Sequence, residues 1–303
     1  WFLDKFLNHK LRSLWLRRQI NSIKPGFIHA LELQNAGYTA LRAVEGITPR
    51  PNLIVTNYGS DIYWFSRFPK HLEKIRKLLG TADRYSAECH RDVALAKELG
   101  FKGTLMPVIP NAGGFSDKVL SAKLESGAAR NLILVKGYQG WVGRAEIAIE
   151  ALKNISNQLS GLEVVFYSSN RKTVRSAKRF ARNTGVKATI YKKNRLTHAE
   201  MLALFSQAKV YVGLSLSDGI STSLLEAMAM GAIPVQTSTA CCDEWFTHTG
   251  VAVQDLSPEV VADAILRGLE LSNDHGNRTI NRETIRAKAS EESVINAALK
   301  FYR

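Results

Sequence analysis

Short apolar runs alternate with longer amphipathic segments along most of the chain. The runs Leu53–Thr56, Leu132–Val135 and Val210–Leu216 consist mostly of aliphatic residues, which is typical of strands buried on both faces of a parallel sheet. Segments such as Arg144–Leu159 and Thr197–Ala208 instead carry apolar residues at helical spacing. Strands and helices in alternation predict an α/β fold in which helices cross over between parallel strands.

The alternation occurs twice, and the polar segment Ser116–Arg130 separates the two series. We therefore expect two Rossmann-like domains facing a cleft, formed by residues 1–127 and residues 128–282. A single helix over Glu283–Tyr302 is predicted to close the chain as residues 283–303. The first series shows no opening strand with a Gly-rich turn, so we expect that domain to lack its N-terminal strand or strands in this sequence.

Composition narrows the class of protein. The chain has 303 residues, of which 45% are hydrophobic, enough for a sizeable core in each domain. No apolar run reaches the roughly 18 residues of a membrane span, and the first residues lack the pattern of a secretory signal. The adjacent Cys241 and Cys242 have no histidine or cysteine partner at metal-ligand spacing. We expect a cytoplasmic protein without disulfides and without a metal site.

The formal net charge of +14 favours contact with anions. A basic surface attracts nucleic acid, anionic lipid headgroups or phosphorylated small molecules. No zinc finger, RNP-type aromatic motif or basic heptad region accompanies the charge, so nucleic acid is not the expected partner. The basic segment Phe2–Ser22 has apolar residues at helical spacing, which suits either a surface helix covering a sheet or a helix lying on an anionic membrane.

The segment Ser217–Val235, SDGISTSLLEAMAMGAIPV, carries the strongest candidate chemistry. A buried strand before it would deliver Asp218 to the carboxyl edge of a sheet, where α/β proteins bind ligands. A helix then opens, and its free N–H groups suit a diphosphate. Glu226, placed on the first turn, suits ribose hydroxyls. The candidate ligand-binding residues of this segment are Gly219, Ile220, Ser221, Thr222, Ser223 and Glu226.

A purely structural interpretation of the same residues stays open. Ser223 and Glu226 have the spacing of a capping box, in which the glutamate merely closes the helix N-terminus. Asp218 is also an ordinary turn residue.

A second Gly-rich segment, Val135–Arg144 (VKGYQGWVGR), follows the first strand of the second domain. It lacks the GK[ST] ending of a P-loop. Lys136 and Arg144 at this position can hold a diphosphate, with Gly137 allowing close approach of the backbone. The alternative is two solvated surface cations.

The run SDGISTSLLEAMAMGAIPV resembles the donor-binding signature of family 4 glycosyltransferases of the GT-B fold. The family pattern places an acidic residue, seven intervening residues and a glutamate before an EAMA-x-G-x-P-V segment. The acidic position is usually Glu in that family and is Asp218 here. In the family a basic pair neutralises the departing nucleoside diphosphate, and Lys136 and Arg144 resemble that pair.

The resemblance implies roles for further residues. Leu196 and Tyr167 correspond to the region that packs the nucleotide base. In the first domain, the turn Gly59–Asp61 resembles a GSD turn of the family, in which Asp61 would orient an acceptor hydroxyl or the donor sugar. An Asx-type turn is the structural alternative for Asp61. The resemblance also implies that the last helix crosses back to the first domain.

The activity implied by the resemblance is a retaining transfer of a sugar from a nucleoside-diphosphate donor to a glycan or lipid-linked acceptor. The sequence has no DxD triplet, so we expect cations and a helix N-terminus, rather than a metal, to stabilise the leaving diphosphate. No cofactor other than this donor substrate is expected. Two alternatives remain: a nucleotide-sugar epimerase of the same fold, and a non-enzymatic module that binds polyanions.

Overall fold

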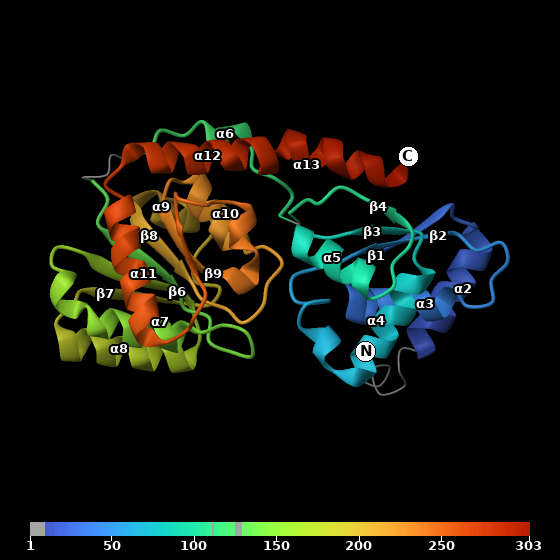
Figure 1. Ribbon diagram of the computed structural model, residues 1–303, viewed down its shortest axis with the longest axis horizontal. Coiled ribbons are helices and arrows are strands. Elements are labelled where there is room, and N and C mark those ends of the chain that lie inside the picture. The colour runs from blue at the N-terminus through green and yellow to red at the C-terminus, as the bar shows by residue number, and fades with distance from the viewer. Residues whose placement is uncertain (1–9, 111, 125–128) are drawn as a thin grey trace. The chain divides into compact units, whose positions relative to one another are not determined.

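The protein is described by a computed structural model covering residues 10–110, 112–124 and 129–303 (Figure 1). It divides into two compact units. Unit 1 consists of Trp1–Gly113 together with Val294–Arg303, and unit 2 of Gly114–Ser293. The boundary predicted between residues 127 and 128 lies outside the described residues, as do the first apolar residues of the predicted helix Phe2–Ser22.

Unit 1 is built on a parallel four-stranded sheet with the order β1-β2-β3-β4. The strands are β1 (Phe27–Leu31), β2 (Asn52–Thr56), β3 (Arg84–Ser86) and β4 (Thr104–Leu105). The helices are α2 (Lys10–Ile23), α3 (Tyr38–Val44), α4 (Pro69–Thr81) and α5 (His90–Glu98), with a π-helical turn at Leu33–Gly37 and a 3-10 turn at Phe65–Arg67. Apolar side chains of β2 and α4, including Leu53, Val55 and Leu78, form the centre of its core.

Unit 2 is built on a parallel six-stranded sheet with the order β10-β9-β8-β5-β6-β7. The strands are β5 (Leu132–Lys136), β6 (Glu163–Ser169), β7 (Ala188–Lys192), β8 (Ala208–Gly213), β9 (Ile233–Thr237) and β10 (Val251–Val253). The helices are α6 (Asp117–Leu120), α7 (Ala145–Asn154), α8 (Arg171–Thr184), α9 (His198–Gln207), α10 (Thr222–Ala229), α11 (Pro258–Leu271) and α12 (His275–Ala289). Short 3-10 turns lie at Ser156–Gln158, Ser238–Ala240 and Cys242–Glu244.

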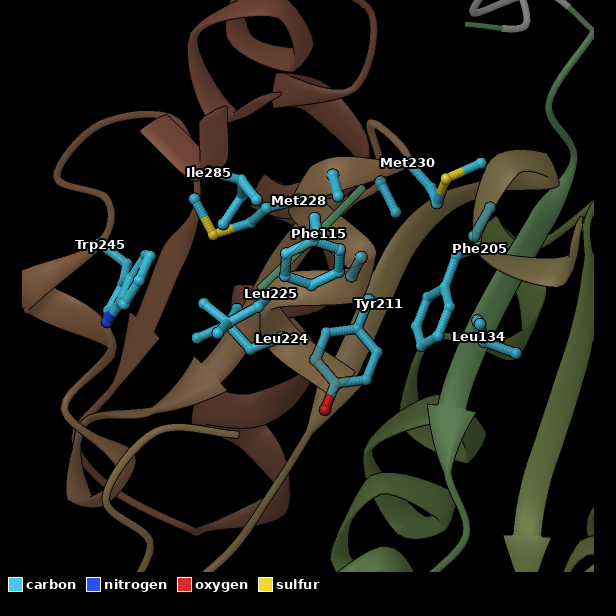
Figure 2. Packing of buried hydrophobic residues seen from close by; sticks show 14 of the residues in the cluster. Phe115, Leu134, Phe205, Tyr211, Leu224, Leu225, Met228, Met230, Trp245 and Ile285 are labelled. Carbon is cyan, nitrogen blue, oxygen red and sulfur yellow. The ribbon is translucent and has the colours of Figure 1, made fainter. Parts of the chain in front are cut away.

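Both faces of the second sheet are buried, which explains its nearly continuous apolar strands. Side chains alternate between the faces along a strand. In β5, Ile133 and Val135 therefore pack in the core layer of α7, α8 and α11, whereas Leu134 packs in the layer of α9, α10 and α12. Figure 2 shows this second layer, in which Tyr211 lies beside Leu224 and Leu225 of α10.

The end of the chain differs from the single helix predicted over Glu283–Tyr302. α12 ends at Ala289, the backbone of Ser290 is extended, and α13 (Glu291–Ala298) begins afterwards, followed by a 3-10 turn at Leu299–Tyr302. The break has a local cause, because the Oγ of Ser290 accepts a hydrogen bond from the backbone N–H of Ser293 at 3.3 Å. Periodicity alone does not reveal such a cap.

The final segment is tied to the sheet of unit 1. Arg84 donates from a guanidinium nitrogen to the carbonyl oxygen of Phe301 at 2.7 Å, and Nδ1 of His29 lies 2.7 Å from the hydroxyl of Tyr302. Among the described residues, no helix is at once long enough and apolar enough to cross a membrane.

Candidate functional site

The strand order of unit 2 locates a candidate ligand site. From β5 the chain proceeds outward through β6 to β7, and it then returns to β8 and proceeds the other way through β9 to β10. The neighbours β5 and β8 therefore flank the point where the strand order reverses. Open α/β sheets bind ligands outside the carboxyl ends of the strands at such a point.

A cavity of about 90 Å³ lies at this position. The last residues of β5 and β8, the loops that follow them and one residue of β9 line it: Lys136, Tyr138, Val142, Gly143, Gly213, Leu214, Ser215, Ser217, Asp218, Ser221 and Gln236. Complete small-molecule sites occupy about 300–1,000 Å³, so this cavity is large enough to enclose only one part of such a ligand. A hollow of about 450 Å³, lined in part by Glu163 and Lys187, lies at the amino ends of the strands, away from this chemistry.

The Gly-rich loop after β5 lies tightly against β6. The N–H of Gly137 donates to the carbonyl oxygen of Tyr167 at 2.7 Å, and a Cβ atom at Gly137 would stand 2.8 Å from that oxygen. Only glycine allows this approach. The N–H of Leu216 donates to the carbonyl oxygen of Val142 at 2.9 Å, which joins the loops after β5 and β8.

Lys136 and Ser221 meet across the cavity. The ammonium Nζ at the end of β5 donates to Oγ of Ser221 at 3.2 Å. Ser221 is buried and is the N-cap of α10, yet its side chain makes no capping hydrogen bond. A cation therefore lies beside the positive end of a helix, an arrangement that attracts an anion.

Arg144 has a different local role from Lys136. One guanidinium nitrogen donates to the carbonyl oxygens of Gly140 and Gly143, at 3.0 and 2.8 Å, so the side chain braces the Gly-rich loop. Arg144 is also absent from the described lining of the cavity. Of the predicted basic pair, Lys136 thus lines the cavity, whereas Arg144 stabilises the Gly-rich loop that forms part of the cavity wall.

Glu226 lies in the second turn of α10, not in the first turn as predicted. Its carboxylate forms no capping box with Ser223. Its Oε1 lies 2.8 Å from Nε2 of His198, the first residue of α9. Because an ionised carboxylate only accepts hydrogen bonds, the imidazole donates from Nε2. The capping box occurs instead at the start of α9, between Thr197 and Glu200.

The surroundings of Glu226 act on its ionisation. Burial raises the pKa of this carboxyl above its ordinary value, and the hydrogen bond from His198 and the charge of Lys136 act in the opposite direction. Glu226 is buried, whereas 69% of the His198 side chain is exposed. The pair thus connects a buried carboxylate to the solvent-facing start of α9.

The other candidates in this segment occupy distinct environments. The strand β8 ends at Gly213, not at Leu216 as predicted, because the backbone of Leu214 and Leu216 turns to pair with the Gly-rich loop. Asp218 therefore lies on a loop lining the cavity, and its Oδ1 accepts the N–H of Gly219 at 3.0 Å. Ile220 is buried in the core. Thr222 is exposed and Ser223 half-buried at the start of α10.

Two residues predicted beside the nucleotide base lie in or against the core. The Tyr167 ring is fully buried and meets Phe205 edge-on with centroids 5.8 Å apart, so its backbone, rather than its side chain, contacts the Gly-rich loop. Leu196 is half-buried and packs against the same core layer. Their roles in binding a base stay predictions.

Asp61 belongs to unit 1. Its Oδ2 accepts the backbone N–H groups of Leu33 and Tyr58 at 2.9 and 3.0 Å, which fixes the turn after β2. Burial raises the pKa of Asp61 to about 7, although the two backbone hydrogen bonds act against this shift.

Two cavity or site residues escaped the sequence interpretation. Nothing in the local sequence marks His198 as a partner of Glu226, because their contact depends on the packing of α9 against α10. Gln236 lines the cavity and is buried in β9. The available signal was a single amide that directly follows the apolar residues Ile233–Val235 of β9.

Residues 130–270 match the family model described as glycosyl transferases group 1. No curated protein matches the chain in sequence. Several solved structures share its fold. Sucrose-phosphate synthase from Thermosynechococcus elongatus superposes with a TM-score of 0.73 at 17% identity, covering 97% of this chain and 79% of that one.

Two further structures show the same fold. The α,α-trehalose-phosphate synthase (UDP-forming) from Burkholderia xenovorans has a TM-score of 0.70 at 13% identity, covering 95% of this chain and 76% of that one. Anabaena HepE, solved with UDP and glucose, has a TM-score of 0.70 at 12% identity, covering 95% and 80%. Residues 130–270, which make up most of unit 2, thus match the group 1 glycosyltransferases, and the chain as a whole has the GT-B fold of these solved enzymes.

Proposed function

We propose that this protein is a cytoplasmic glycosyltransferase that moves a sugar from a nucleoside-diphosphate donor to a glycan or lipid-linked acceptor in polysaccharide or cell-surface glycan synthesis. The transfer retains the anomeric configuration and needs no metal. The observation that carries the proposal is the cavity between the ends of β5 and β8, where Lys136, Ser221 and Asp218 converge.

The diphosphate would lie against Lys136 and the first turn of α10. An ammonium group has three donors, and the hydrogen bond to Ser221 uses one of them. Positive groups that are already in place when negative charge builds on a leaving group lower the barrier to its departure. Arg144 would supply its remaining guanidinium donors from the wall of the Gly-rich loop.

The nucleoside and the sugar would lie to either side of this anion site. Glu226, oriented by His198, would accept hydrogen bonds from the ribose hydroxyls. Asp218, beside Gly219 on the cavity wall, would contact the donor sugar. Asp61 of unit 1 is proposed to orient an acceptor hydroxyl or the donor sugar. The complexes of similar folds with UDP support a nucleoside diphosphate as the ligand.

Retention would follow a front-face displacement, in which the donor phosphate helps to deprotonate the acceptor hydroxyl. Such a path needs no carboxylate nucleophile. The positive charges of Lys136 and the helix end support a metal-independent reaction.

The outward face of α2 supports peripheral contact with an anionic membrane. Leu14 and Trp15 are 57% and 63% exposed, and α2 contains arginines but no acidic residue. On the inner side, Ser13 and Arg17 anchor the helix by donating to carbonyl oxygens of Thr39 and Ala43. Exposed tryptophan and leucine with flanking cations are typical of helices that lie at a lipid surface.

The decisive experiment measures nucleotide binding by calorimetry. Lys136→Ala and Glu226→Ala should each weaken UDP or GDP binding about tenfold or more, which corresponds to roughly 1.4 kcal/mol. Exposed Lys123→Ala, in the same unit, should bind like wild type. A thermal-shift screen of UDP-, GDP-, dTDP- and ADP-sugars would name the donor, since a ligand that binds the folded state raises its apparent stability. Wild-type affinity in both site variants would refute the site.

A further inference from the structure

Positive charge is concentrated in one segment of unit 2. Residues 171–195 include ten lysines and arginines and no aspartate or glutamate. The ten are Arg171, Lys172, Arg175, Lys178, Arg179, Arg182, Lys187, Lys192, Lys193 and Arg195. All ten side chains are exposed. We call this surface, formed by α8, β7 and the loop after β7, the α8–β7 face.

Packing fixes the orientation of the cations on α8. Thr173, Ala177 and Phe180 are buried against the sheet, and the Phe180 ring meets Phe166 edge-on at 6.4 Å between centroids. The six cations of α8 occupy the opposite side of the helix. With a rise of about 1.5 Å per residue, they form a stripe about 16 Å long from Arg171 to Arg182.

The stripe is continued at the start of α8. The backbone N–H of Lys193 donates to the carbonyl oxygen of Ser169 at 3.1 Å, directly before the N-cap Asn170. Lys192 at the end of β7 and the loop cations Lys193 and Arg195 therefore lie near Arg171. This end of the stripe is at the carboxyl edge of the sheet, on the same side as the candidate donor cavity.

This arrangement is unfavourable for the isolated helix. Cations at i,i+3 and i,i+4, such as Arg175 with Lys178 and Arg179, repel one another. Arg171 and Lys172 also place positive charge at the positive end of the helix dipole. Within the part of the chain that the structure describes, none of the six helix cations forms an ion pair. Local rules broken together in this way are expected where a surface serves a function.

The chemistry of the face restricts its partner. No large hydrophobic side chain of residues 171–195 is exposed, in contrast to α2, so the face has nothing to insert into a bilayer. The aromatic residues of the segment, Phe180 and Tyr191, are buried or half-buried, so no exposed ring offers a platform for stacking nucleic acid bases. A narrow stripe of cations instead matches a linear chain of regularly spaced anions.

We propose that the α8–β7 face binds a linear acidic polysaccharide, the growing acceptor or product of the transfer. This identification of the acceptor class rests on the proposed function. The anionic chain would lie along α8 and lead toward the carboxyl edge of the sheet, where the donor cavity opens. Binding would relieve the repulsion among the helix cations.

The test compares two triple variants of equal charge change. Arg175→Gln/Lys178→Gln/Arg179→Gln alters the stripe, and Lys70→Gln/Arg76→Gln/Lys97→Gln removes three exposed cations from α4 and α5. The probes are polygalacturonate and dextran sulfate, with neutral dextran as the uncharged control. The stripe variant should bind the anionic probes at least about tenfold more weakly, and the slope of log affinity against log salt should fall by about one per cation removed. The α4–α5 variant should bind like wild type.

Three results would overturn the proposal: no binding of wild type to either anionic probe at low salt, equal losses in both triple variants, or tight binding to phosphatidylglycerol vesicles or single-stranded DNA that only the stripe variant loses. Circular dichroism establishes that each variant is folded. UDP calorimetry separates this proposal from the proposed function, because the stripe variant should keep wild-type UDP affinity. Failure of wild type to bind any nucleoside diphosphate would refute the proposed function while leaving the polysaccharide measurement interpretable.

Discussion

Nε2 of His198 lies 2.8 Å from Oε1 of Glu226, so the first residue of α9 holds a buried carboxylate of α10. We predict that His198→Ala weakens UDP or GDP binding roughly fivefold, because a hydrogen bond whose donor side chain is largely exposed to water contributes about 1 kcal/mol. Titration calorimetry at neutral pH measures the effect.

The conservative variant His198→Gln tests whether positioning is the reason. Its side-chain amide can donate to Glu226, and affinity should return toward the wild-type value. An equal loss in both His198 variants would show that the hydrogen bond does not position Glu226.

The buried carboxyl group of Asp61 should make unit 1 less stable as the pH rises toward neutrality. The pKa of its carboxyl is about 7 in the folded protein against an ordinary value of 3.8, chiefly because of burial. Between these values the folded state binds more protons than the unfolded state. The free energy of unfolding therefore falls as the pH rises from about 4 toward 7. Asp61→Asn keeps an acceptor oxygen for Leu33 and Tyr58 but cannot ionise, so urea unfolding from pH 5 to 8 should show a weaker decline.

Asp83 is a control of opposite sign. Burial acts upward on its pKa, but the hydrogen bonds from Arg50 and from the backbone N–H of Leu53, together with the nearby positive charges, outweigh burial, and the pKa lies below its ordinary value. Asp83→Asn should remove stability that is present above pH 4. If Asp61→Asn leaves the pH dependence of unfolding as it is in wild type, the buried carboxyl of Asp61 does not titrate in this range.

Arg130 ties together the carboxyl ends of two helices. Its guanidinium, which is 1% exposed, donates to the carbonyl oxygens of Ala208 and Met230 at 2.9 and 2.8 Å, directly after α9 and α10. Arg130→Met should lower the free energy of unfolding by about 2–3 kcal/mol, because buried carbonyl groups lose their donors. Urea denaturation followed by tryptophan fluorescence measures it, and exposed Lys123→Met should change stability by less than about 0.5 kcal/mol.

Gly137 has no room for a side chain. An alanine Cβ would stand 2.8 Å from the carbonyl oxygen of Tyr167. This oxygen belongs to β6, which is paired on both sides, so it cannot move away without disturbing the sheet. We expect Gly137→Ala to destabilise unit 2 by about 1–3 kcal/mol and to weaken nucleotide binding. Gly26→Ala, where a Cβ would meet nothing within 4 Å, is the matched control. Unchanged melting temperature and UDP affinity in Gly137→Ala would contradict the close approach.

Removal of divalent metal should leave the transfer rate within about twofold of the untreated enzyme, since Lys136 and the start of α10 are proposed to stabilise the leaving diphosphate. Product formation with and without EDTA measures this. A loss of activity that Mg²⁺ or Mn²⁺ restores would contradict the metal-independent mechanism.

Local sequence determined much of the architecture. The apolar runs at Leu132–Val135 and Leu53–Thr56 lie within β5 and β2, because residues that are apolar on both faces can be satisfied only inside a covered parallel sheet. The sequence of the segment after β8 also predicted a loop followed by a helix, which is α10. The ends of the elements were less predictable. β8 ends at Gly213 because the backbone of the following residues forms hydrogen bonds with the neighbouring Gly-rich loop, and the final helix breaks at Ser290.

The arrangement of the site was decided only by tertiary structure. Lys136 and Ser221 are 85 residues apart, and they meet because β5 and β8 become neighbours when the strand order reverses. The spacing of Ser223 and Glu226 would allow a local capping box. Packing of α9 against α10 instead brings the Glu226 carboxylate into hydrogen-bond contact with His198. Periodicity determines which face of an element is buried, whereas strand order and helix packing determine which distant side chains share one site.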